Sequence, residues 1–321
     1  MNGLYQGLMD LPSPICHAPP EPKPTDGRIR IVRHTHLTSA IETPSGKDQK
    51  YENFPVGSWL LPAHFRPHIA TFYWFARTID DIADSDSLTA EEKIERLSLF
   101  EATLKGEVSG NPGYERGDAM RSSLLETEIS IQHCLDLIIA FKRDATKFRY
   151  PDWSSLMDYC RYSAAPVGRY LIDLHGGSKT NYPPSDALCS ALQILNHLQD
   201  CREDFEKMNR VYLPLDIMQK HKVKVDDLSR DVTSEGLRDV IQEVLNKTET
   251  LIDDSKPLVR RLVSLRLAME AQSIINIAGC LASELTRRDP LAERVRLSKW
   301  QYAGSCIVGV LVAIYTQLHA K

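Results

Sequence analysis

The sequence predicts an all-α fold, and three observations support that prediction. From residue 63 onward, apolar residues recur three and four positions apart with charged residues between them, which is the spacing of an amphipathic helix. No segment alternates convincingly over strand length, and no Asn-Gly or Asp-Gly pair joins two such segments. No internal repeat and no linker divides the body, so we expect one helical domain of about nine to eleven helices.

Composition narrows the class of protein further. The 321 residues, 42% of them hydrophobic, are enough to bury one large core. A formal net charge of -4 gives no reason to expect a nucleic-acid partner, because nucleic-acid binders usually carry a basic face. The seven cysteines are scattered and form no CxxC pair, which predicts reduced thiols in a cytoplasmic protein. The N-terminus lacks the basic start and apolar run of a signal peptide.

The chain divides into a leader and a body. The leader, residues 1–48, is rich in proline and is expected to be disordered. The body, residues 49–321, is expected to hold the whole folded domain. Within it, clusters of Pro and Gly near 110–117, 176–184 and 213–214 separate the helices.

Helical periodicity runs through most of the body. The clearest stretches, in chain order, are 73–84, 97–104, 124–138, 185–205 and 237–285. The final stretch, 302–318, is the most apolar in the protein and lies at the short end of membrane-spanning length. It also contains Ser, Thr and Gln, so two interpretations stay open. It is either a C-terminal helix packed on the body or a helix that docks on or partly into a bilayer.

The first stretch ends in a cluster of carboxylates, in the sequence YWFARTIDDIAD. Positions four apart lie on one face of a helix, so Asp80 and Asp84 point the same way, and Arg77 precedes Asp80 by one turn. Tyr73 lies on that face one further turn back, whereas Asp81 lies about 100° around the helix from Asp80. Taken alone the cluster is a weak signal, because a polar helix end with an ordinary Arg–Asp pair is the simpler explanation.

A second polar cluster follows in the sequence QILNHLQDCREDF. Gln193, Asn196, Asp200 and Asp204 are spaced by three, four and four, which places two amides and two carboxylates along one helical stripe. Two such stripes on two helices of a bundle can face each other across a cavity. Their like charges then repel at close range unless a counterion lies between them.

The two clusters together favour a metal–diphosphate site. Their ligands are hard oxygens, which suit Mg²⁺, an ion that takes a few carboxylates and fills its other positions with water and phosphate oxygens. Arg77 is expected to hold the phosphate as well. No P-loop or GxGxxG is present, so nucleotide hydrolysis and dinucleotide redox chemistry lack their usual phosphate cradle. A diphosphate held by Mg²⁺ in an apolar bundle is placed to leave, generating a carbocation that the walls keep from water.

The sequence resembles the squalene and phytoene synthase family over about residues 50–300. One stretch, YCRYSAAPVGRYL from Tyr159, is similar to the family's Tyr-Cys signature. A second follows the family pattern Gln-x-x-Asn-x-x-x-Asp-x-x-x-Asp … Arg-x-Tyr-x-Pro through Gln193, Asn196, Asp200, Asp204, Arg210, Tyr212 and Pro214. The resemblance implies the isoprenoid-synthase fold, a helical bundle around a central cavity, with residues 49–321 as the catalytic domain.

The resemblance also implies roles for individual residues. The implied Mg²⁺ ligands are Asp80, Asp84, Asn196, Asp200 and Asp204. The implied catalytic residues are Arg77 on the diphosphate and, through their hydroxyls or ring faces, Tyr73 and Tyr159. The implied substrate-binding residues are Asn53, Phe54, Arg77, Gln193, Arg210 and Tyr212. Second choices, each with an ordinary ion pair or a solvated charge as the competing explanation, are Asp81, Lys147, Arg149, Arg161, Arg294 and Lys299.

Within the family, the stretches YSAAPVGR and FKRDATKFRY resemble one bacterial branch, the hydroxysqualene synthases of hopanoid biosynthesis. That resemblance implies a Mg²⁺-dependent lyase that ionises presqualene diphosphate and lets water capture the rearranged cation, giving hydroxysqualene. Its pathway neighbours would be a presqualene diphosphate synthase and a flavin-dependent reductase. His197 and Gln199 depart from the family pattern, so we expect one of them to help hold the water, with a packed histidine as the alternative for His197.

Two other functions stay open. The same fold performs head-to-head condensation of two prenyl diphosphates, as in squalene and phytoene synthases. A non-catalytic assembly subunit that kept the fold is the other, although its metal ligands would be expected to erode. Because the product would be apolar, we also expect peripheral contact of a cytoplasmic enzyme with the inner membrane.

Overall fold

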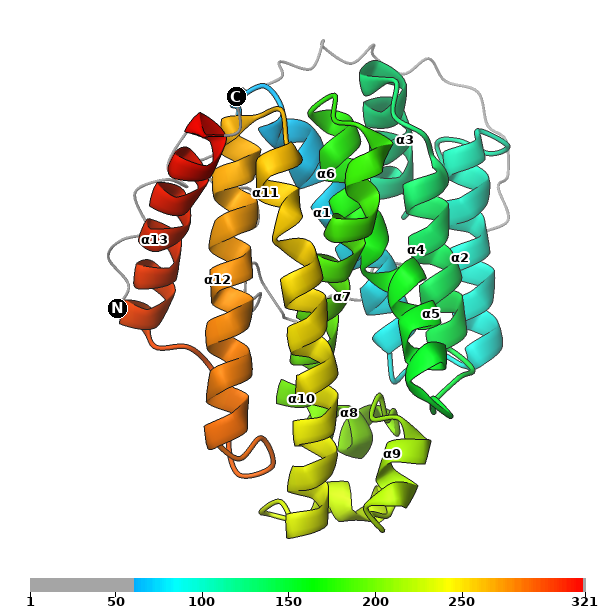
Figure 1. The fold of residues 1–321 in the computed structure, drawn as a ribbon. Helices are drawn as coiled ribbons and strands as arrows, with labels where there is room; N and C mark the ends of the chain where they lie inside the picture. The colour runs from blue at the N-terminus through cyan, green and yellow to red at the C-terminus, as the bar shows by residue number, and fades with distance from the viewer. Residues whose placement is uncertain (1–60, 320–321) are drawn as a thin grey trace, which may run out of the picture. The chain divides into compact units, whose positions relative to one another are not determined.

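The computed structural model describes residues 61–319, and its regular structure in that range is helical (Figure 1). The α-helices are α1 (Arg66–Asp84), α2 (Ala90–Lys105), α3 (Glu115–Thr127), α4 (Gln132–Asp144), α5 (Trp153–Ser163), α6 (Ala165–Leu174), α7 (Tyr182–Gln199), α8 (Cys201–Met208), α9 (Leu215–Lys220), α10 (Glu235–Ser255), α11 (Pro257–Arg261), α12 (Leu265–Arg287) and α13 (Lys299–Leu318). Two 3₁₀ turns, η2 (Lys179–Asn181) and η3 (Val225–Ser229), lie between them. The extended pairing in this part of the chain is one isolated bridge between Arg149 and Val211. The predicted all-α fold is confirmed.

The described part of the chain has more helices than expected because several are short and three predicted runs are interrupted, including 185–205, which breaks at Asp200 between α7 and α8. Helices α8, α9 and α11 have eight, six and five residues. The run 124–138 breaks at Glu128, whose left-handed φ of 56° separates α3 from α4. The run 237–285 breaks before Pro257, which starts α11, and again at Leu262, whose backbone is extended.

Local sequence signals set the helix ends. The Thr89 hydroxyl accepts a hydrogen bond from the Glu92 backbone N–H at 3.2 Å, and the Glu92 carboxylate accepts one from the Thr89 N–H at 2.8 Å, which starts α2. Gly106 ends α2 with a φ of 76°, a left-handed backbone that favours glycine. Pro183 and Pro184 lie in the first turn of α7, where a missing N–H costs little. The predicted cluster 213–214 lies in a loop between helices, and the clusters 110–117 and 176–184 begin in such loops and end in the first turns of α3 and α7.

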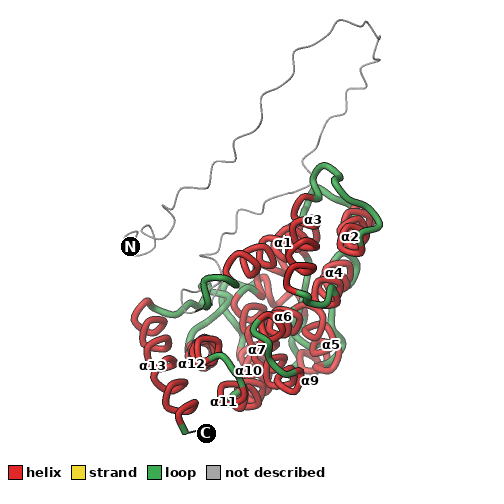
Figure 2. The backbone as a smooth tube through the Cα atoms, turned by 90° about the horizontal axis from the view of Figure 1, so that it is seen from above, coloured by secondary structure: helices red, strands yellow, loops and turns green. Residues whose placement is uncertain are grey.

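Helix α7 is central to the packing, since it contacts α5, α6, α10 and α12 (Figures 1 and 2). Helix α1 packs against α2, α3 and α4. One continuous apolar core runs through both groups and includes Phe75 of α1, Leu195 of α7, Leu245 of α10 and Ala278 of α12, all fully buried. The two helices that carry the polar clusters, α1 and α7, are therefore fixed by the same core.

Helix α13 packs against α12 through small residues. Ser305, Gly309 and Ala313 are its buried positions, and a Cβ on Gly309 would lie 2.5 Å from the Cα of Ser273. The Asn276 side chain of α12 donates a hydrogen bond to the Ser305 carbonyl at 3.2 Å. The predicted C-terminal helix packed on the body is therefore confirmed. By length and composition α13 is also the one helix between residues 61 and 319 apolar enough to cross a membrane.

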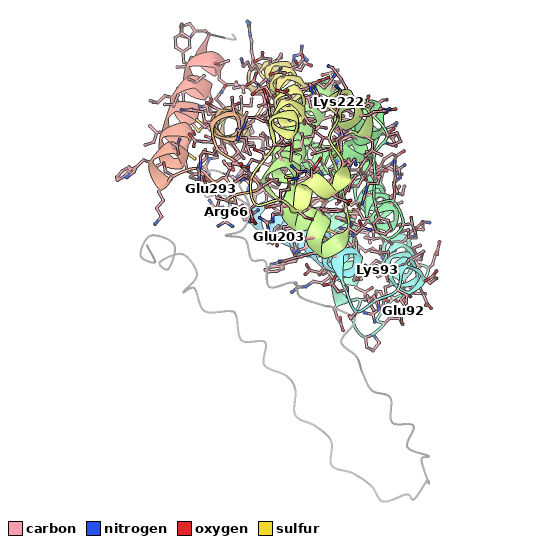
Figure 3. The ribbon with its side chains drawn as sticks, turned by 90° about the horizontal axis from the view of Figure 1, so that it is seen from below. Arg66, Glu92, Lys93, Glu203, Lys222 and Glu293 are labelled. Carbon is pink, nitrogen blue, oxygen red and sulfur yellow. The ribbon has the colours of Figure 1, made fainter. Side chains whose placement is uncertain are left out.

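The opposite face of α13 is apolar and exposed. The exposed side chains are Trp300, Ile307, Val308, Leu311, Val312, Tyr315 and Leu318. In Figure 3 the helix stands at the edge of the body, with its outer side chains directed away from the other helices. Packing on α12 and contact with a bilayer use different faces, so the first does not prevent the second.

Candidate active site

A cavity of about 390 Å³ lies inside the helical body. Both predicted polar clusters contribute to its wall, namely Tyr73, Arg77, Asp80, Asp84, Gln193, Asn196, Asp200 and Asp204. The rest of the wall is largely apolar and includes Phe72, Leu188, Leu192, Leu262, Leu267 and Ile274. Two rows of polar side chains from helices far apart in the sequence thus meet in one apolar cavity.

On α1, two carboxylates hold Arg77. Its Nη1 lies 2.9 Å from Asp80 Oδ2, and its Nε donates to Asp81 Oδ1 at 3.0 Å. Burial alone would lower the pKa of Arg77, but the charges of Asp80 and Asp81 outweigh burial and raise it. Asp81 is buried and does not line the cavity, so it orients the Arg77 guanidinium.

In the second cluster, Asp200 stands at the junction of α7 and α8, so the predicted single helix is two. The hydrogen bonds across the junction persist. The Asp200 N–H donates to the Asn196 carbonyl at 3.0 Å, and the Asp204 N–H donates to the Asp200 carbonyl at 2.8 Å. The stripe therefore keeps its direction. The Asp200 carboxylate contacts Arg294 through Nε at 2.6 Å and Nη2 at 2.8 Å.

Arg210 connects the two clusters. It follows α8 in the chain and reaches the end of α1, where Nη1 donates to Asp84 and Nη2 donates to the Ala83 carbonyl at 2.9 Å. Nη2 also donates to the Asp144 carbonyl at 3.2 Å. Burial works against the charge of Arg210, but Tyr212, Asp144 and Asp84 raise its pKa. The loop that follows the second cluster is thereby anchored on the helix that carries the first.

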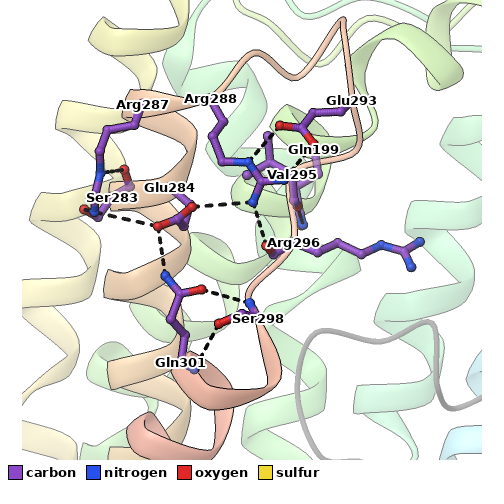
Figure 4. A network of polar contacts seen from close by, with 10 residues as sticks. All are labelled: Gln199, Ser283, Glu284, Arg287, Arg288, Glu293, Val295, Arg296, Ser298 and Gln301. Carbon is purple, nitrogen blue, oxygen red and sulfur yellow. Dashed lines mark hydrogen bonds and ion pairs between the residues drawn. The ribbon is translucent and has the colours of Figure 1, made fainter. Parts of the chain in front are cut away.

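A polar network fixes the loop between α12 and α13 that carries Arg294 (Figure 4). Arg288 at the end of α12 donates two hydrogen bonds of 2.8 Å to the Glu293 carboxylate. From α7, the Gln199 side-chain amide donates to the Val295 carbonyl. The backbone on both sides of Arg294 is therefore held, and its guanidinium is directed into the cavity.

Tyrosines form part of the wall beside the second cluster. The Tyr159 hydroxyl donates to Asp144 Oδ2 at 2.7 Å, and the ring lies 5.6 Å from that of Tyr212. Burial raises the pKa of both Tyr159 and Tyr212, so both keep their protons at neutral pH. Tyr73 lines the cavity from α1. Such rings can stabilise a positive charge in the cavity through their π faces.

His197 lines the cavity, whereas Gln199 does not. The His197 ring stacks on Tyr212 with centroids 3.5 Å apart. Its Nε2 lies 3.1 Å from the Gln193 amide nitrogen, and its Nδ1 lies 3.8 Å from Asp204. Burial lowers the pKa of His197, which favours the neutral ring. Of the two residues expected to supply a group that holds the water, only His197 lines the cavity, because the Gln199 side chain is buried and donates to the Val295 carbonyl.

Asp144, at the end of α4, is a cavity residue that sequence reasoning missed. It is 3% exposed, and its Oδ1 has no hydrogen-bond partner in the described part of the chain. Burial raises the pKa of Asp144 to about 7, against the opposing effects of Arg210 and Tyr159. The signal was available, since Asp144 follows the apolar run LIIAF as Asp80 follows an apolar helix.

Glu270 of α12 is a second missed residue. It is 3% exposed and lines the cavity. Leu267, Ala271 and Ile274 line the cavity from the same helix, so Glu270 is a carboxylate within an apolar stripe of helical spacing. That interruption was the available signal.

Carboxylates outnumber guanidinium groups at the polar end of the cavity. The carboxylates there are Asp80, Asp84, Asp144, Asp200 and Asp204, and the guanidinium groups are Arg77, Arg210 and Arg294. Between residues 61 and 319, no three His, Cys, Asp or Glu side chains form a group able to hold a metal unaided. An all-oxygen donor set of this kind fits Mg²⁺, which takes a few carboxylates and completes its shell with water and anion oxygens.

The other predicted residues lie elsewhere. Asn53, Phe54 and the leader 1–48 fall outside the described residues. Arg161 and Lys299 are exposed, Lys147 lies over the Tyr150 ring, and Arg149 donates to Asn209. None of these four second choices lines the cavity, whereas Arg294 does.

Comparison with known proteins agrees with the motifs. A model of the squalene/phytoene synthase family matches residues 47–301. The hydroxysqualene synthase of Rhodopseudomonas palustris is 43% identical over 266 residues, covering 83% of this chain and 90% of that one. The hydroxysqualene synthase of Zymomonas mobilis is 39% identical over 287 residues, covering 89% and 96%. A squalene synthase structure from Alicyclobacillus acidocaldarius matches with a TM-score of 0.64 and 29% identity, covering 72% of this chain and 87% of that one.

Proposed function

The chain belongs to the squalene/phytoene synthase family, and we propose that it converts presqualene diphosphate and water into hydroxysqualene and diphosphate. Two relatives that carry the name hydroxysqualene synthase favour this reaction over others of the family. The observation that carries the proposal is a cavity whose one end is lined by carboxylates and guanidinium groups and whose remaining wall is largely apolar. Such a cavity suits a ligand with a diphosphate head and hydrocarbon tails.

Three arginines are proposed to bind the diphosphate. Arg77, Arg210 and Arg294 come from three separate elements and line the same cavity. Each contacts a carboxylate in this structure, namely Asp80, Asp84 or Asp200. Binding of the diphosphate would redirect these guanidinium groups from the carboxylates to phosphate oxygens. Their charge would then stabilise the leaving diphosphate as its C–O bond breaks.

The two rows of oxygen ligands are proposed to hold Mg²⁺, directly or through water. The ligands are Asp80, Asp84, Asn196, Asp200 and Asp204. When bound there, Mg²⁺ would neutralise the charge of the leaving diphosphate. The contribution of the chain is to place like charges on two walls, where their repulsion favours a bound cation.

The apolar wall and the tyrosines are proposed to protect the cation that ionisation leaves behind. Aliphatic side chains keep bulk water out, so the cation has time to rearrange before capture. The rings of Tyr73, Tyr159 and Tyr212 would stabilise it through their π faces. Asp144 fixes the direction of the Tyr159 hydroxyl through a 2.7 Å hydrogen bond. Formation of hydroxysqualene then requires that one water molecule reach the rearranged cation and add to it.

Separate incubations with presqualene diphosphate and farnesyl diphosphate, each with Mg²⁺ and without a reductant, test the proposal. We expect hydroxysqualene from presqualene diphosphate and no product from farnesyl diphosphate. Head-to-head condensation, the rival activity, predicts turnover of farnesyl diphosphate. Turnover of farnesyl diphosphate alone would overturn the proposal.

We also propose that α13 rests on a bilayer surface. Its outer face has no charged residue between Trp300 and Leu318, and Trp300 and Tyr315 are aromatic residues of the kind enriched at membrane interfaces. An apolar product would pass from the enzyme into lipid. A presqualene diphosphate synthase and a flavin-dependent reductase of the same pathway would supply the substrate and consume the product at that surface.

A further inference from the structure

The turn between α11 and α12, called here the α11–α12 corner (residues 260–266), has an inner and an outer side. Leu262 is buried and lines the cavity, as do Leu258 before it and Leu267 after it. The backbone at Leu262 is extended, so neighbouring side chains point to opposite sides. Val263 is 79% exposed, the most exposed Val, Leu or Ile between residues 61 and 319. The chain thus passes from the cavity wall to the outer surface within one residue.

The outer side of the corner is cationic. Arg260, Arg261 and Arg266 are exposed, and none of them forms an ion pair within the described part of the chain. Other exposed arginines do find a carboxylate, as Arg230 does in η3 at 2.6 Å. No Asp or Glu occurs in residues 255–269, although the chain as a whole carries a net charge of -4. The three charges of the corner are therefore not compensated locally.

The end of α13 is fastened to this corner. The Gln317 side chain donates one hydrogen bond to the Val259 carbonyl at 2.7 Å and one to the Leu262 carbonyl at 2.9 Å. Figures 1 and 2 show the end of α13 beside α11 and the start of α12. Leu318, the next residue, is exposed. The apolar outer face of α13 therefore reaches the α11–α12 corner.

Arginines around an apolar tip suit the surface of an anionic bilayer. Each basic residue close to anionic headgroups adds to the attraction, and an aliphatic side chain gains by leaving water for the boundary between headgroups and acyl chains. The carboxylates that precede the corner, Asp253 and Asp254, lie at the end of α10, where Asp253 pairs with Lys256. Residues 253–266 hold four basic and two acidic side chains, a net charge of +2. The charge of this surface is therefore complementary to acidic lipid.

We propose that the α11–α12 corner binds the anionic headgroups of a bilayer beside α13. This inference deepens the bilayer contact proposed for α13 and rests on it. Arg260, Arg261 and Arg266 would contact lipid phosphates, while Val263 and Leu318 would enter the apolar layer. The other side of the corner is cavity wall, so a bilayer bound there would give an apolar product a short path from the cavity into lipid.

Co-sedimentation with phosphatidylcholine vesicles, with and without about 30% phosphatidylglycerol, tests the inference. Wild type should bind the anionic vesicles at least about tenfold more tightly than the neutral ones, and about 0.5 M salt should remove most of that difference by screening. The triple variant Arg260→Gln/Arg261→Gln/Arg266→Gln should bind both kinds of vesicle equally. Its turnover of detergent-dispersed presqualene diphosphate should stay within about twofold of wild type, because these side chains do not line the cavity.

A matched control removes the same charge elsewhere. Lys220, Lys222 and Lys224 are exposed in and after α9, which Figure 1 shows at the opposite end of α10 from α11. Lys220→Gln/Lys222→Gln/Lys224→Gln should keep the preference for anionic vesicles. Val263→Asp, which places a charge at the apolar tip, should weaken binding to both kinds of vesicle.

The outcomes separate the corner from the proposals on which it rests. A preference for anionic vesicles that survives in the arginine variant, or that falls equally in the lysine variant, would overturn the role of the corner and leave the α13 contact intact. Equal binding of wild type to both kinds of vesicle would do the same. Self-association of wild type that the arginine variant loses, with equal vesicle binding by both, would assign the corner to a second copy of the chain.

Wild type that binds neither kind of vesicle would overturn both the corner and the α13 contact. Vesicle binding is measured without substrate, so failure of the proposed reaction would leave these results unchanged.

Discussion

Arg210 and Asp84, which lie 126 positions apart in the chain, form an ion pair that joins the loop after the second acidic cluster to the end of the helix that carries the first. Arg210 is 5% exposed and also donates to two backbone carbonyls. The contact therefore ties together the two rows of side chains that are proposed to hold Mg²⁺.

Replacing Arg210 should destabilise the fold. Arg210→Met leaves the half-buried Asp84 without its partner, and the free energy of unfolding should fall by about 3 kcal/mol. Urea unfolding measures this value. Arg143→Met removes an exposed ion pair with Asp158 and should cost less than about 1 kcal/mol. If both substitutions lowered the free energy of unfolding by the same amount, the Arg210–Asp84 pair would stabilise the fold no more than an exposed ion pair does.

Asp144 should make stability depend on pH. Its pKa is raised from 3.8 to about 7 by burial, so between those values the folded chain binds a proton that the unfolded chain has released. Its contribution to stability is therefore fully present below about pH 4 and is lost as pH rises through about 7. Asp144→Asn removes this titration but keeps an oxygen that accepts the Tyr159 hydroxyl.

Urea unfolding of both proteins at about pH 5 and about pH 8 measures the effect. We expect Asp144→Asn to gain stability relative to wild type on going from the lower to the higher pH, by up to a few kcal/mol at about 1.36 kcal/mol per pKa unit. The same stability difference at both pH values would contradict the raised pKa.

The two glycines of α13 should respond in opposite directions to alanine. A Cβ on Gly309 would lie 2.5 Å from the Ser273 Cα, so Gly309→Ala should force α13 from α12 and cost about 1–3 kcal/mol. Gly304 has open space around its Cβ position, so Gly304→Ala should stabilise the helix by up to about 1 kcal/mol. Thermal unfolding of both variants checks this difference in sign. A tolerated Gly309→Ala would mean that the two helices pack less closely.

Membrane contact through α13 should depend on its outer face. Ile307 and Leu311 are each 62% exposed, and the double variant Ile307→Asp/Leu311→Asp should lower the fraction of protein that co-sediments with liposomes by at least about fivefold. Leu125 of α3 is 63% exposed, and Leu125→Asp should leave that fraction unchanged. Equal sedimentation of all three proteins would exclude the outer face as the contact.

The sequence was informative where the structure depends on local spacing. Asp80 and Asp84 share a face because they are four residues apart, and Asp200 and Asp204 keep theirs because hydrogen bonds continue across the junction of α7 and α8. The break at Asp200 itself was not predictable, since no Pro or Gly marks it. Glu128 likewise adopts a positive φ without a sequence signal that separates it from a helical residue.

Contacts between segments that are distant in the chain could not be predicted from the sequence. The reach of Arg294 to Asp200 depends on how the loop after α12 is anchored, and the pairing of Tyr159 with Asp144 depends on how α4 and α5 pack. Glu270 was visible in the sequence as a carboxylate within an apolar stripe. Its significance appeared only when the fold placed that stripe on the wall of the cavity.

The central claim is that two rows of oxygen ligands bind one diphosphate through shared divalent ions, and calorimetric titration of inorganic diphosphate tests it most directly. Wild type should bind diphosphate at least about tenfold more tightly with Mg²⁺ than without it, a difference of about 1.4 kcal/mol. Asp80→Asn and Asp200→Asn, one from each row, should each abolish that difference, whereas the exposed Asp158→Asn should retain it. Equal binding with and without Mg²⁺, or a Mg²⁺ effect that survives both row variants, would contradict the account.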